Sequence, residues 1–595
     1  ITDPLGHSVT YTTREDGKLE RITDKLGNES HFTYDKAGRL AALTGPLGHS
    51  RRMEYNPAGQ VTRVTDEAGY STTYQYGNQG KPETLTYADG STEVVKYGPG
   101  GLPVEVKDKK SGTSFLEYDL LGRLVKITGA DGNSRHYGYT PTGQTASFTD
   151  ELGNVTRYRY DRLDRLVEVI DPDGNATTYE YNLLNLPVKV TDPGGNSRAY
   201  SYNALGRITG STGPGGNRTT YSYDKAGNLL TVTNPGGETV TYGYDKLNRR
   251  RRVTNNAGEK HTFSYDPGGN PVKVMDPAGN IYRYKYDEAG RVIKEVNRLK
   301  KKQFYTYTPR GLLESVTDFA GITTDYRYDY AGRLTESISP DDRKTFTYDA
   351  AGNLTGAENS HSRLAYGYDE MNRLTSAIDH LTGSSSAYAY DDAGRLVKRT
   401  NRDSTGNSRE TLYTRGSLGE LLSVTGSGGS SISFTYDKAG RPVKESRSNH
   451  TETLYTYNSA GLPETILHKA GGRVFRSFGY LYDSTGRRTW QVEEDGGITA
   501  YSYDRAGRLA KVIYPFDSGK PEADFKEFAD LGFYTCRPNR ETDKPYTFNV
   551  FDPAFDLLDR GKLESILDGE EEVYRAFNRW PDEEEVKWQV DIPSW

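Results

Sequence analysis

The sequence predicts an all-β repeat protein, a long meander of β-hairpins that forms one solenoid-like sheet, followed by a small C-terminal segment of α+β character. Two observations predict the sheet. Tyrosine recurs every 21 residues over most of the chain, and glycine-containing turns recur at fixed distances from each tyrosine. A third observation, a change of composition near residue 516, predicts the separate C-terminal segment.

The tyrosine spacing defines the repeat. It is constant from Tyr34 to Tyr328 and less regular afterwards, and a degenerate copy with Thr13 in the tyrosine slot precedes the series. The later tyrosines of the series are Tyr348, Tyr368, Tyr390, Tyr413, Tyr436, Tyr457, Tyr482 and Tyr503. We therefore assign residues 1–515 to about 24 repeats and residues 516–595 to an acidic, variable C-terminal domain.

Each repeat is expected to contain two strands. In Tyr242-Gly243-Tyr244 the two rings share one face of a strand, because side chains alternate with a period of two. The stretch Leu166–Ile170 alternates in the same way. Two strands per 21 residues, with a turn at each end, indicate a continuous antiparallel meander.

Glycine marks both turns of the repeat. In Asp171-Pro172-Asp173-Gly174 proline presets a type I turn, and glycine takes the left-handed position that follows. The other turn has glycine four residues after the tyrosine, as at Gly38, Gly122, Gly227, Gly290, Gly352 and Gly507. Where that glycine is missing, the slot holds a residue type that tolerates positive φ, namely Asp164, Asn185, Asn248 or Asn372. The Tyr413 repeat departs from this rule, with Ser417 in the slot and Gly419 two residues later.

Composition fits a thin sheet better than an unfolded chain. Mean hydropathy is −0.80 and hydrophobic residues make up 34%, values typical of disorder, yet the chain has 47 tyrosines among 595 residues. We expect the tyrosine rings to stack between repeats as a structural ladder, with their hydroxyls in contact with water.

Several protein classes are excluded by composition. No apolar run approaches the roughly 18 residues that a membrane span requires. The single cysteine, Cys536, excludes a disulfide scaffold, and the net charge of −6 argues against general nucleic-acid binding.

The repeat motif Tyr-Asp-x-x-Gly-Arg-Leu, followed by a Thr-Asp-Pro-x-Gly-Asn turn, resembles the YD repeat of the Rhs family. That family includes bacterial polymorphic toxins, insecticidal toxin-complex subunits and animal teneurins, and the resemblance covers about 85% of the chain. The structural repeat positions that carry it include Tyr34, Asp35, Gly38, Arg39, Tyr118, Asp119, Gly122, Arg123, Tyr223, Asp224, Gly227, Tyr286, Asp287, Gly290, Arg291, Tyr503, Asp504, Gly507 and Arg508.

The resemblance implies that the repeats coil into a hollow, shell-like sheet that encapsulates or presents a C-terminal effector for toxin delivery in competition between bacteria. It also implies a secreted or cell-surface location. The C-terminal domain would be the cargo, and a secretion-system component or an immunity protein would be a further partner. The family's Asp-Pro-x-Gly-Leu cleavage motif is absent, since Asp552-Pro553-Ala554-Phe555 lacks it, so no autoprotease residues are assigned. The opening inside a repeat turn is typical of a fragment without its N-terminal part.

The C-terminal domain offers little catalytic chemistry. Residues 511–595 contain 20 acidic and 11 basic residues, and no histidine follows residue 515. A histidine base and a two-cysteine zinc site are therefore excluded there. We interpret Cys536 as an inert thiol and the acidic runs 570–572 and 582–585 as solvated helix faces. Short helices are predicted over 557–567 and from 570 to 577.

No catalytic, cofactor-binding or metal-binding residue is expected in the repeats, whose histidines fall at scattered phases. The basic runs 249–252 and 300–302 are interpreted as solvated strand or turn charges rather than nucleic-acid contacts. Two other hypotheses remain open at this point: a cell-surface adhesion protein that stacks sugars on exposed tyrosines, and a toxin whose activity lies in the last 80 residues.

Overall fold

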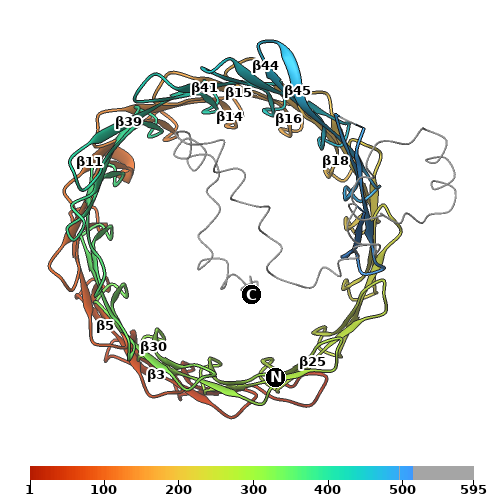
Figure 1. The fold of residues 1–595 in the computed structure, drawn as a ribbon. Helices are drawn as coiled ribbons and strands as arrows, with labels where there is room; N and C mark the ends of the chain where they lie inside the picture. The colour runs from red at the N-terminus through yellow and green to blue at the C-terminus, as the bar shows by residue number, and fades with distance from the viewer. Residues whose placement is uncertain (495, 514–595) are drawn as a thin grey trace. The chain divides into compact units, whose positions relative to one another are not determined.

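The computed structural model describes residues 1–494 and 496–513. These residues form 48 β-strands and one short 3-10 turn, η1 (Pro99–Gly101) (Figure 1). The chain divides into two compact units, one of residues 1–409 with 417–419, the other of residues 410–416 and 420 onward. The predicted helices at 557–567 and 570–577, Cys536 and the 515/516 boundary all lie outside the described residues.

The strands of the first unit are short and regular. They are β1 (Thr10–Thr13), β2 (Leu19–Thr23), β3 (Glu29–Tyr34), β4 (Leu40–Thr44), β5 (Ser50–Tyr55), β6 (Val61–Thr65), β7 (Ser71–Tyr76), β8 (Pro82–Thr86), β9 (Thr92–Tyr97), β10 (Pro103–Lys107), β11 (Thr113–Tyr118), β12 (Leu124–Thr128), β13 (Ser134–Tyr139), β14 (Thr145–Thr149), β15 (Val155–Tyr160), β16 (Leu166–Ile170), β17 (Ala176–Tyr181), β18 (Pro187–Thr191), β19 (Ser197–Tyr202), β20 (Ile208–Thr212), β21 (Arg218–Tyr223), β22 (Leu229–Thr233), β23 (Thr239–Tyr244), β24 (Arg250–Thr254), β25 (Lys260–Tyr265), β26 (Pro271–Met275), β27 (Ile281–Tyr286), β28 (Val292–Val296), β29 (Lys302–Tyr307), β30 (Leu313–Thr317), β31 (Thr323–Tyr328), β32 (Leu334–Ile338), β33 (Arg343–Tyr348), β34 (Leu354–Glu358), β35 (Arg363–Tyr368), β36 (Leu374–Asp379), β37 (Ser385–Tyr390) and β38 (Leu396–Arg402).

The later strands belong mostly to the second unit and several are longer. They are β39 (Ser408–Arg415), β40 (Leu421–Gly426), β41 (Ser431–Tyr436), β42 (Pro442–Arg447), β43 (Thr451–Tyr457), β44 (Pro463–Ala470), β45 (Arg473–Tyr482), β46 (Arg488–Glu493), β47 (Ile498–Tyr503) and β48 (Leu509–Ile513).

The predicted hairpin meander is confirmed. Each strand pairs antiparallel with the strands before and after it in sequence, within each unit, as β22 pairs with both β21 and β23. A repeat consists of a five-residue strand, a turn and a six-residue strand that ends in the tyrosine of the series, as in β22 and β23. The regular 21-residue repeat thus produces a regular strip of hairpins.

Two turns alternate along the two edges of this strip. We call the turn after the tyrosine the Tyr-Asp turn (for example Asp119–Arg123) and the turn inside the hairpin the Pro-Gly turn (for example Asp171–Asn175). Both have the same backbone hydrogen bonds. The amide of the first residue donates to the carbonyl of the fifth, and the amide of the fourth donates to the carbonyl of the first, at 2.9 to 3.0 Å. The fourth residue is left-handed, with φ of 76° at Gly122 and 83° at Gly174.

The predicted left-handed residues are confirmed where glycine is absent, since φ is 56° at Asp164, 60° at Asn185, and 61° at Asn248 and Asn372. The assignment of the Tyr413 repeat was wrong by two residues. Arg415 ends β39 and pairs with Leu421, as the tyrosine does in other repeats, and Gly419 is the left-handed fourth residue with φ of 86°. Ser417 lies in the turn, so this repeat obeys the rule in a shifted register.

The sheet has almost no enclosed core. Among the described residues, Tyr413 and Val424 are the buried hydrophobic side chains, and both lie in the second unit. Most side chains on the strands are partly exposed. The low hydrophobicity of the chain therefore reflects a thin sheet, as the composition predicted.

Within the first unit, the strip coils back alongside itself. Pro-Gly turns between residues 24 and 175 contact Tyr-Asp turns of the same unit, from the turn that begins at residue 266 to Ser417, and we call this line of contact the seam. Tyr330 donates a hydrogen bond to Asp89, and Ser417 donates one to Asp173. The Arg310 guanidinium lies 3.1 Å from Asp66 and the Lys110 ammonium 3.4 Å from Asp349. Figure 1 shows this return in the neighbourhood of β3, β5 and β30.

The offset along the seam is nearly constant. Asp89 and Tyr330 are 241 residues apart, and Asp173 and Ser417 are 244 residues apart. At 21 residues per repeat, the strip returns after roughly eleven and a half repeats. Lys110 bridges two successive Tyr-Asp turns, since it also donates to the Asp369 carbonyl at 3.2 Å and to the Asn372 side chain at 3.3 Å. At the seam, the Pro-Gly turns on one edge of the strip therefore contact the Tyr-Asp turns on the other edge, one coil later.

The seam predicts energetic coupling between residues that are distant in sequence. In a double-mutant cycle of Asp89→Ala and Tyr330→Phe, we expect a coupling free energy of about 1 kcal/mol, because each change removes one side of the same hydrogen bond. Urea denaturation of the two single variants and the double variant measures it. The control cycle pairs Asp89→Ala with Tyr388→Phe, which should be additive; equal coupling in both cycles would contradict the seam.

Candidate functional site

The residues predicted to define the repeat meet in the Tyr-Asp turn. The aspartate organises this turn: one oxygen of Asp119 accepts the amides of Leu121 (2.9 Å) and Arg123 (3.0 Å), and the other accepts Nε of Arg123 at 2.7 Å. An aspartate side chain that accepts amides two and four residues ahead replaces backbone partners that the tight turn leaves open. The aspartate and arginine of the motif are thus one hydrogen-bonded unit.

The arginine connects this unit to the next repeat. Arg123 donates to the carbonyl of Thr140 at 3.2 Å, and its guanidinium lies 4.7 Å from the ring centre of Tyr139. The same cation–π contact, at 4.5 to 5.3 Å, joins each arginine to the tyrosine of the following repeat in the pairs Arg39–Tyr55, Arg165–Tyr181, Arg207–Tyr223, Arg249–Tyr265, Arg291–Tyr307, Arg333–Tyr348, Arg373–Tyr390, Arg441–Tyr457 and Arg487–Tyr503. Such contacts contribute about 0.5–1 kcal/mol each at exposed sites.

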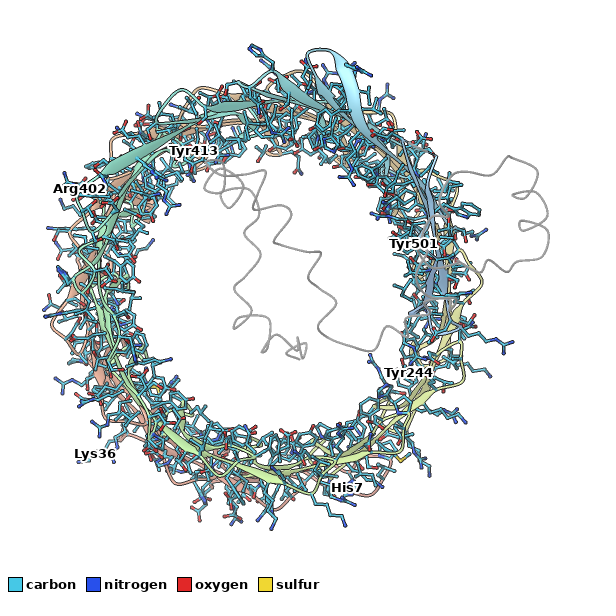
Figure 2. All side chains as sticks on the ribbon, in the orientation of Figure 1. His7, Lys36, Tyr244, Arg402, Tyr413 and Tyr501 are labelled. Atoms are coloured by element: carbon cyan, nitrogen blue, oxygen red, sulfur yellow. The ribbon has the colours of Figure 1, made fainter. Side chains whose placement is uncertain are left out.

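The tyrosine hydroxyl completes the network. Tyr139 donates to the carbonyl of Leu124, 15 residues earlier, at 2.6 Å, and Tyr244 donates to Leu229 at 2.9 Å (Figure 2 labels Tyr244). The same bond recurs in most repeats, from Tyr34 to Leu19 up to Tyr503 to Arg488. The expectation of water-exposed hydroxyls and stacked tyrosines was therefore wrong for this series: the hydroxyls bind backbone, and the rings contact arginine.

The residues predicted to define the repeat make these same contacts in other repeats, with small variations. Asp35 and Arg39, Asp287 and Arg291, and Asp504 and Arg508 form the same ion pair at 2.7 to 2.8 Å. In the turn of Asp224 the arginine is replaced by Asn228, whose amide donates to Asp224 at 2.8 Å. The hydroxyls of Tyr223 and Tyr286 donate to the carbonyls of Ile208 and Pro271 at 2.8 Å. The glycines Gly38, Gly227, Gly290 and Gly507 are left-handed, with φ between 77° and 99°.

The surroundings of the Tyr-Asp turn lower the pKa of its aspartate and raise the pKa of the tyrosine that precedes it, away from neutral pH in both cases. The amide and guanidinium of Arg39 lower the pKa of Asp35, and those of Arg123 lower the pKa of Asp119. Desolvation raises the pKa of Tyr118, and it raises that of Tyr286 to about 12. A carboxylate and a phenol held in these states are hydrogen-bonding groups in the turn, unsuited to act as a general base or acid near neutrality.

Most side chains of the basic runs 249–252 and 300–302 are exposed on the surface of the sheet. Arg249 pairs with Asp245 at 2.8 Å and covers the ring of Tyr265, whereas Arg250, Arg251 and Arg252 are exposed on β24. Lys300 is the left-handed residue of a Pro-Gly turn, with φ of 60°. Within residues 1–494 and 496–513, no group of three or more histidine, cysteine, aspartate or glutamate side chains is placed to hold a metal ion.

The second unit contains a polar network that the repeat pattern does not reveal. Glu445 accepts the hydroxyl of Tyr455 at 2.6 Å and pairs with Arg447 at 2.8 Å. Arg447 donates to Thr453 at 3.1 Å, and the Thr453 hydroxyl lies 3.1 Å from Nδ1 of His468. Burial lowers the pKa of His468 and raises that of Tyr455. The one sequence signal nearby is the longer spacing of 25 residues between Tyr457 and Tyr482.

This network lacks an accessible nucleophile. Thr453, the hydroxyl beside the histidine, is 1% exposed and lies within the sheet. The ring of His468 is 6.1 Å from those of Phe475 and Phe478, which limits its access to solvent. The network is suited to fixing the register of β42, β43 and β44, because three of its four contacts join neighbouring strands.

Comparison with known proteins agrees with this repeat geometry. The RHS repeat family matches residues 15–50, 55–92, 139–197, 202–260, 265–300 and 480–518, and the teneurin YD-shell family matches residues 306–468. The chain belongs to the Rhs, or YD-repeat, family. A comparison with curated proteins found no match.

The Rhs fold is also seen in solved structures. Two crystal structures, of TcdB2-TccC3-TEV and of TcdB2-TccC3, match the chain with TM-scores of 0.57 and 0.51 at 13% and 14% identity. They cover 86% and 88% of this chain, which spans only 38% and 39% of theirs. At this identity the likeness concerns the fold alone.

No helix within the described part of the Rhs chain is long and apolar enough to cross a membrane.

The hydroxyl bond predicts that two tyrosines of one strand differ in importance. Tyr181→Phe removes the donor to the carbonyl of Leu166 and should lower the free energy of unfolding by about 1 kcal/mol. Tyr179 lies on the same face of β17, and its hydroxyl has no hydrogen-bond partner among the described residues, so Tyr179→Phe should change stability by less than about 0.5 kcal/mol. Urea denaturation monitored by circular dichroism compares them; equal losses would contradict the role of the bond.

The raised phenol pKa values predict alkaline unfolding. Desolvation raises the pKa of Tyr286 to about 12 from an ordinary value of 10.0, so the folded state favours the neutral phenol. This stabilisation is fully present below pH 10 and is lost as the pH rises through about 12. Phenolate absorbance and circular dichroism should therefore change together well above pH 10, whereas tyrosines of the urea-unfolded chain titrate near 10. Titration of all tyrosines near 10 in the folded protein would refute this prediction.

Proposed function

We propose that the Rhs repeats form the wall of a shell that encapsulates or presents residues 516–595 as an effector for toxin delivery between bacteria. Family membership supports a shell role, because the toxins that the repeat resembles use it in that way. The likeness of fold to the TcdB2-TccC3 structures supports the same reading. The repeats would have no enzymatic activity of their own.

The observation that carries the proposal is the seam of the first unit. A sheet of this length without a thick core can be stable only if its hairpins are joined to their neighbours along the strip. The seam adds contacts between edges that are 241 to 244 residues apart in sequence. A strip whose hairpins are joined to their neighbours, and whose edges are joined at the seam, makes a continuous wall. Enclosure of a cargo requires such a wall.

The remaining assignments follow from this proposal. We place the boundary between wall and cargo at residues 515 and 516, with the acidic C-terminal domain as cargo. A secreted or cell-surface location, and contact with a secretion-system component or an immunity protein, belong to the same proposal. Enzymatic activity of residues 516–595 stays a prediction, since these residues lie outside the described part of the chain.

The adhesion hypothesis receives no specific support from the repeat. Tyrosine rings that bind sugars must offer a free face, and ten rings of this series have a guanidinium of the preceding repeat over one face, as Arg123 covers Tyr139 at 4.7 Å. Their hydroxyls are bound to backbone carbonyls as well. A glycan array that shows no binding would agree with this geometry.

Protection of the C-terminal domain tests the proposal. A recognition sequence for a site-specific protease is inserted after residue 540 in one variant and in the β44–β45 turn, at Gly471 and Gly472, in a matched control. If the domain is enclosed, cleavage in the native chain should be at least about tenfold slower at the first site than at the turn, and urea should abolish the difference. Equal native rates would contradict enclosure.

A further inference from the structure

Strands β24 to β29 of the first unit are strongly basic. Residues 250–302 contain 13 lysines and arginines against 6 aspartates and glutamates, a net charge of +7 in a chain whose net charge is −6. Four of these cations share one face of three adjacent strands. Lys273 of β26 pairs with Arg283 of β27, and Lys285 of β27 pairs with Lys294 of β28. Side-chain alternation along β27 places both pairs on the same face, and we call these four residues the basic face.

The pairing of Lys285 with Lys294 departs from the rest of the strip. The two positions are the residue before the tyrosine of the series and the third residue of the next strand. Where both positions hold charged residues in the other described repeats, the charges are opposite: Glu54–Arg63, Lys96–Glu105, Glu117–Lys126, Arg159–Glu168, Glu180–Lys189 and Arg327–Glu336. Five of those six pairs are 2.7 to 2.9 Å apart. Like charges directly opposite one another destabilise a sheet, so the repeat itself does not account for the two lysines.

The charge of the basic face is not neutralised within the sheet. Among residues 1–494 and 496–513, no carboxylate lies within ion-pair distance of its four cations. Arg283 and Lys285 are exposed, and the other two cations are partly exposed. Arg402 lies on the corresponding face of β38, and Figure 2 shows it on the outside of the coil. The basic face therefore presents its charge to the outside of the first unit.

The turn that follows β28, at residues 297–301, adds further charge and an apolar side chain. The cations of this turn and of the residue after it are all exposed: Arg298, Lys300, Lys301 and Lys302. Lys300 takes the left-handed position, with φ of 60°, where most Pro-Gly turns of the first unit have glycine. Lysine is disfavoured there relative to glycine, so the turn does not account for this residue either. Between these cations, Leu299 is 67% exposed.

These features fit the surface of an anionic membrane. Clusters of about four to eight lysines and arginines attract anionic lipid headgroups, and here the cations cover a sheet face and the adjoining turn, which suits a planar partner. Leu299 and Phe304, which is 44% exposed and pairs with Lys294, are apolar groups among the cations. Segments that bind the membrane interface combine such side chains with lysine and arginine. A nucleic acid would be attracted by the same charges but would offer the aliphatic Leu299 no partner.

We propose that the basic face and the turn at residues 297–301 dock the first unit on a membrane surface rich in anionic lipids. The cations contact the headgroup phosphates, and Leu299 enters the interface between headgroups and acyl chains. Docking of this kind is reversible and weakens with salt, because it depends on exposed charges. This inference concerns the outside of the coil and does not depend on the proposed function.

Co-sedimentation of the full chain with lipid vesicles tests the proposal. Vesicles of phosphatidylcholine with about 30% phosphatidylserine should bind the protein at least about tenfold more tightly than vesicles of phosphatidylcholine alone. Raising the salt from about 0.1 M to about 1 M should remove most of this difference, because the Debye length falls from about 10 Å to about 3 Å.

Two substitutions separate docking from folding. Lys285→Glu places an acidic residue opposite Lys294, as in Glu117–Lys126, and Lys300→Gly gives the turn its usual glycine. The double variant should be at least as stable to urea as the unaltered chain, yet bind anionic vesicles at least about tenfold more weakly. The control Lys36→Glu with Arg162→Ala makes the same change of net charge at exposed second positions of two Tyr-Asp turns, and should bind like the unaltered chain.

A further variant and a second probe distinguish a membrane from another polyanion. Leu299→Ser leaves the charge unaltered and should weaken binding to anionic vesicles by about threefold or more, because it removes the apolar group from the interface. A single-stranded DNA oligonucleotide is the second probe and should bind more weakly than the anionic vesicles. Equal binding to both kinds of vesicle, equal losses in the double variant and its control, vesicle binding that Leu299→Ser leaves unchanged, or tighter binding to the oligonucleotide would each overturn the proposal.

Discussion

The hydrogen bond from a tyrosine hydroxyl to a backbone carbonyl of its own hairpin is the interaction on which the rest of this structure depends. Tyr139 makes it to Leu124 at 2.6 Å, and Arg123 of the preceding turn lies over its ring. A sheet with almost no buried core cannot rely on apolar burial for its stability. It relies on directional contacts of about 1 kcal/mol each: the hydroxyl bond in most repeats, and the arginine–tyrosine contact in ten of them.

These contacts explain why the aspartate, glycine and arginine accompany the tyrosine. The aspartate fixes the turn, the left-handed fourth residue lets the chain reverse, and the arginine spans from its own turn to the next ring. The stability of the strip is therefore approximately a sum of contributions from each repeat and from each contact between neighbouring repeats. The seam adds a second kind of contact, which Lys110 illustrates by bridging Asp349 and Asn372. One set of contacts therefore holds neighbouring repeats together along the strip, and a different set holds the edges of the strip together at the seam.

Much of the repeat was predictable because its requirements are local. Asn185 and Asn248 identified a left-handed position through residue type alone, and the structure confirms it. Tyr413 was misassigned because residue type defined the slot, whereas strand pairing places Arg415 there. The hydroxyl acceptor was missed since a backbone carbonyl 15 residues away has no residue-type signature. The network around Glu445 and His468 was missed because it depends on the register of three strands.

The sequence by itself determined the hairpin, its two turns and their number, because turn chemistry and side-chain alternation act over a few residues. Only the tertiary structure decided that the strip returns after roughly eleven and a half repeats and which edges then meet. The curvature of a sheet is the sum of small twists over many strands, and no single repeat encodes it. The contacts of Asp89 with Tyr330 and of Asp173 with Ser417 follow from that sum.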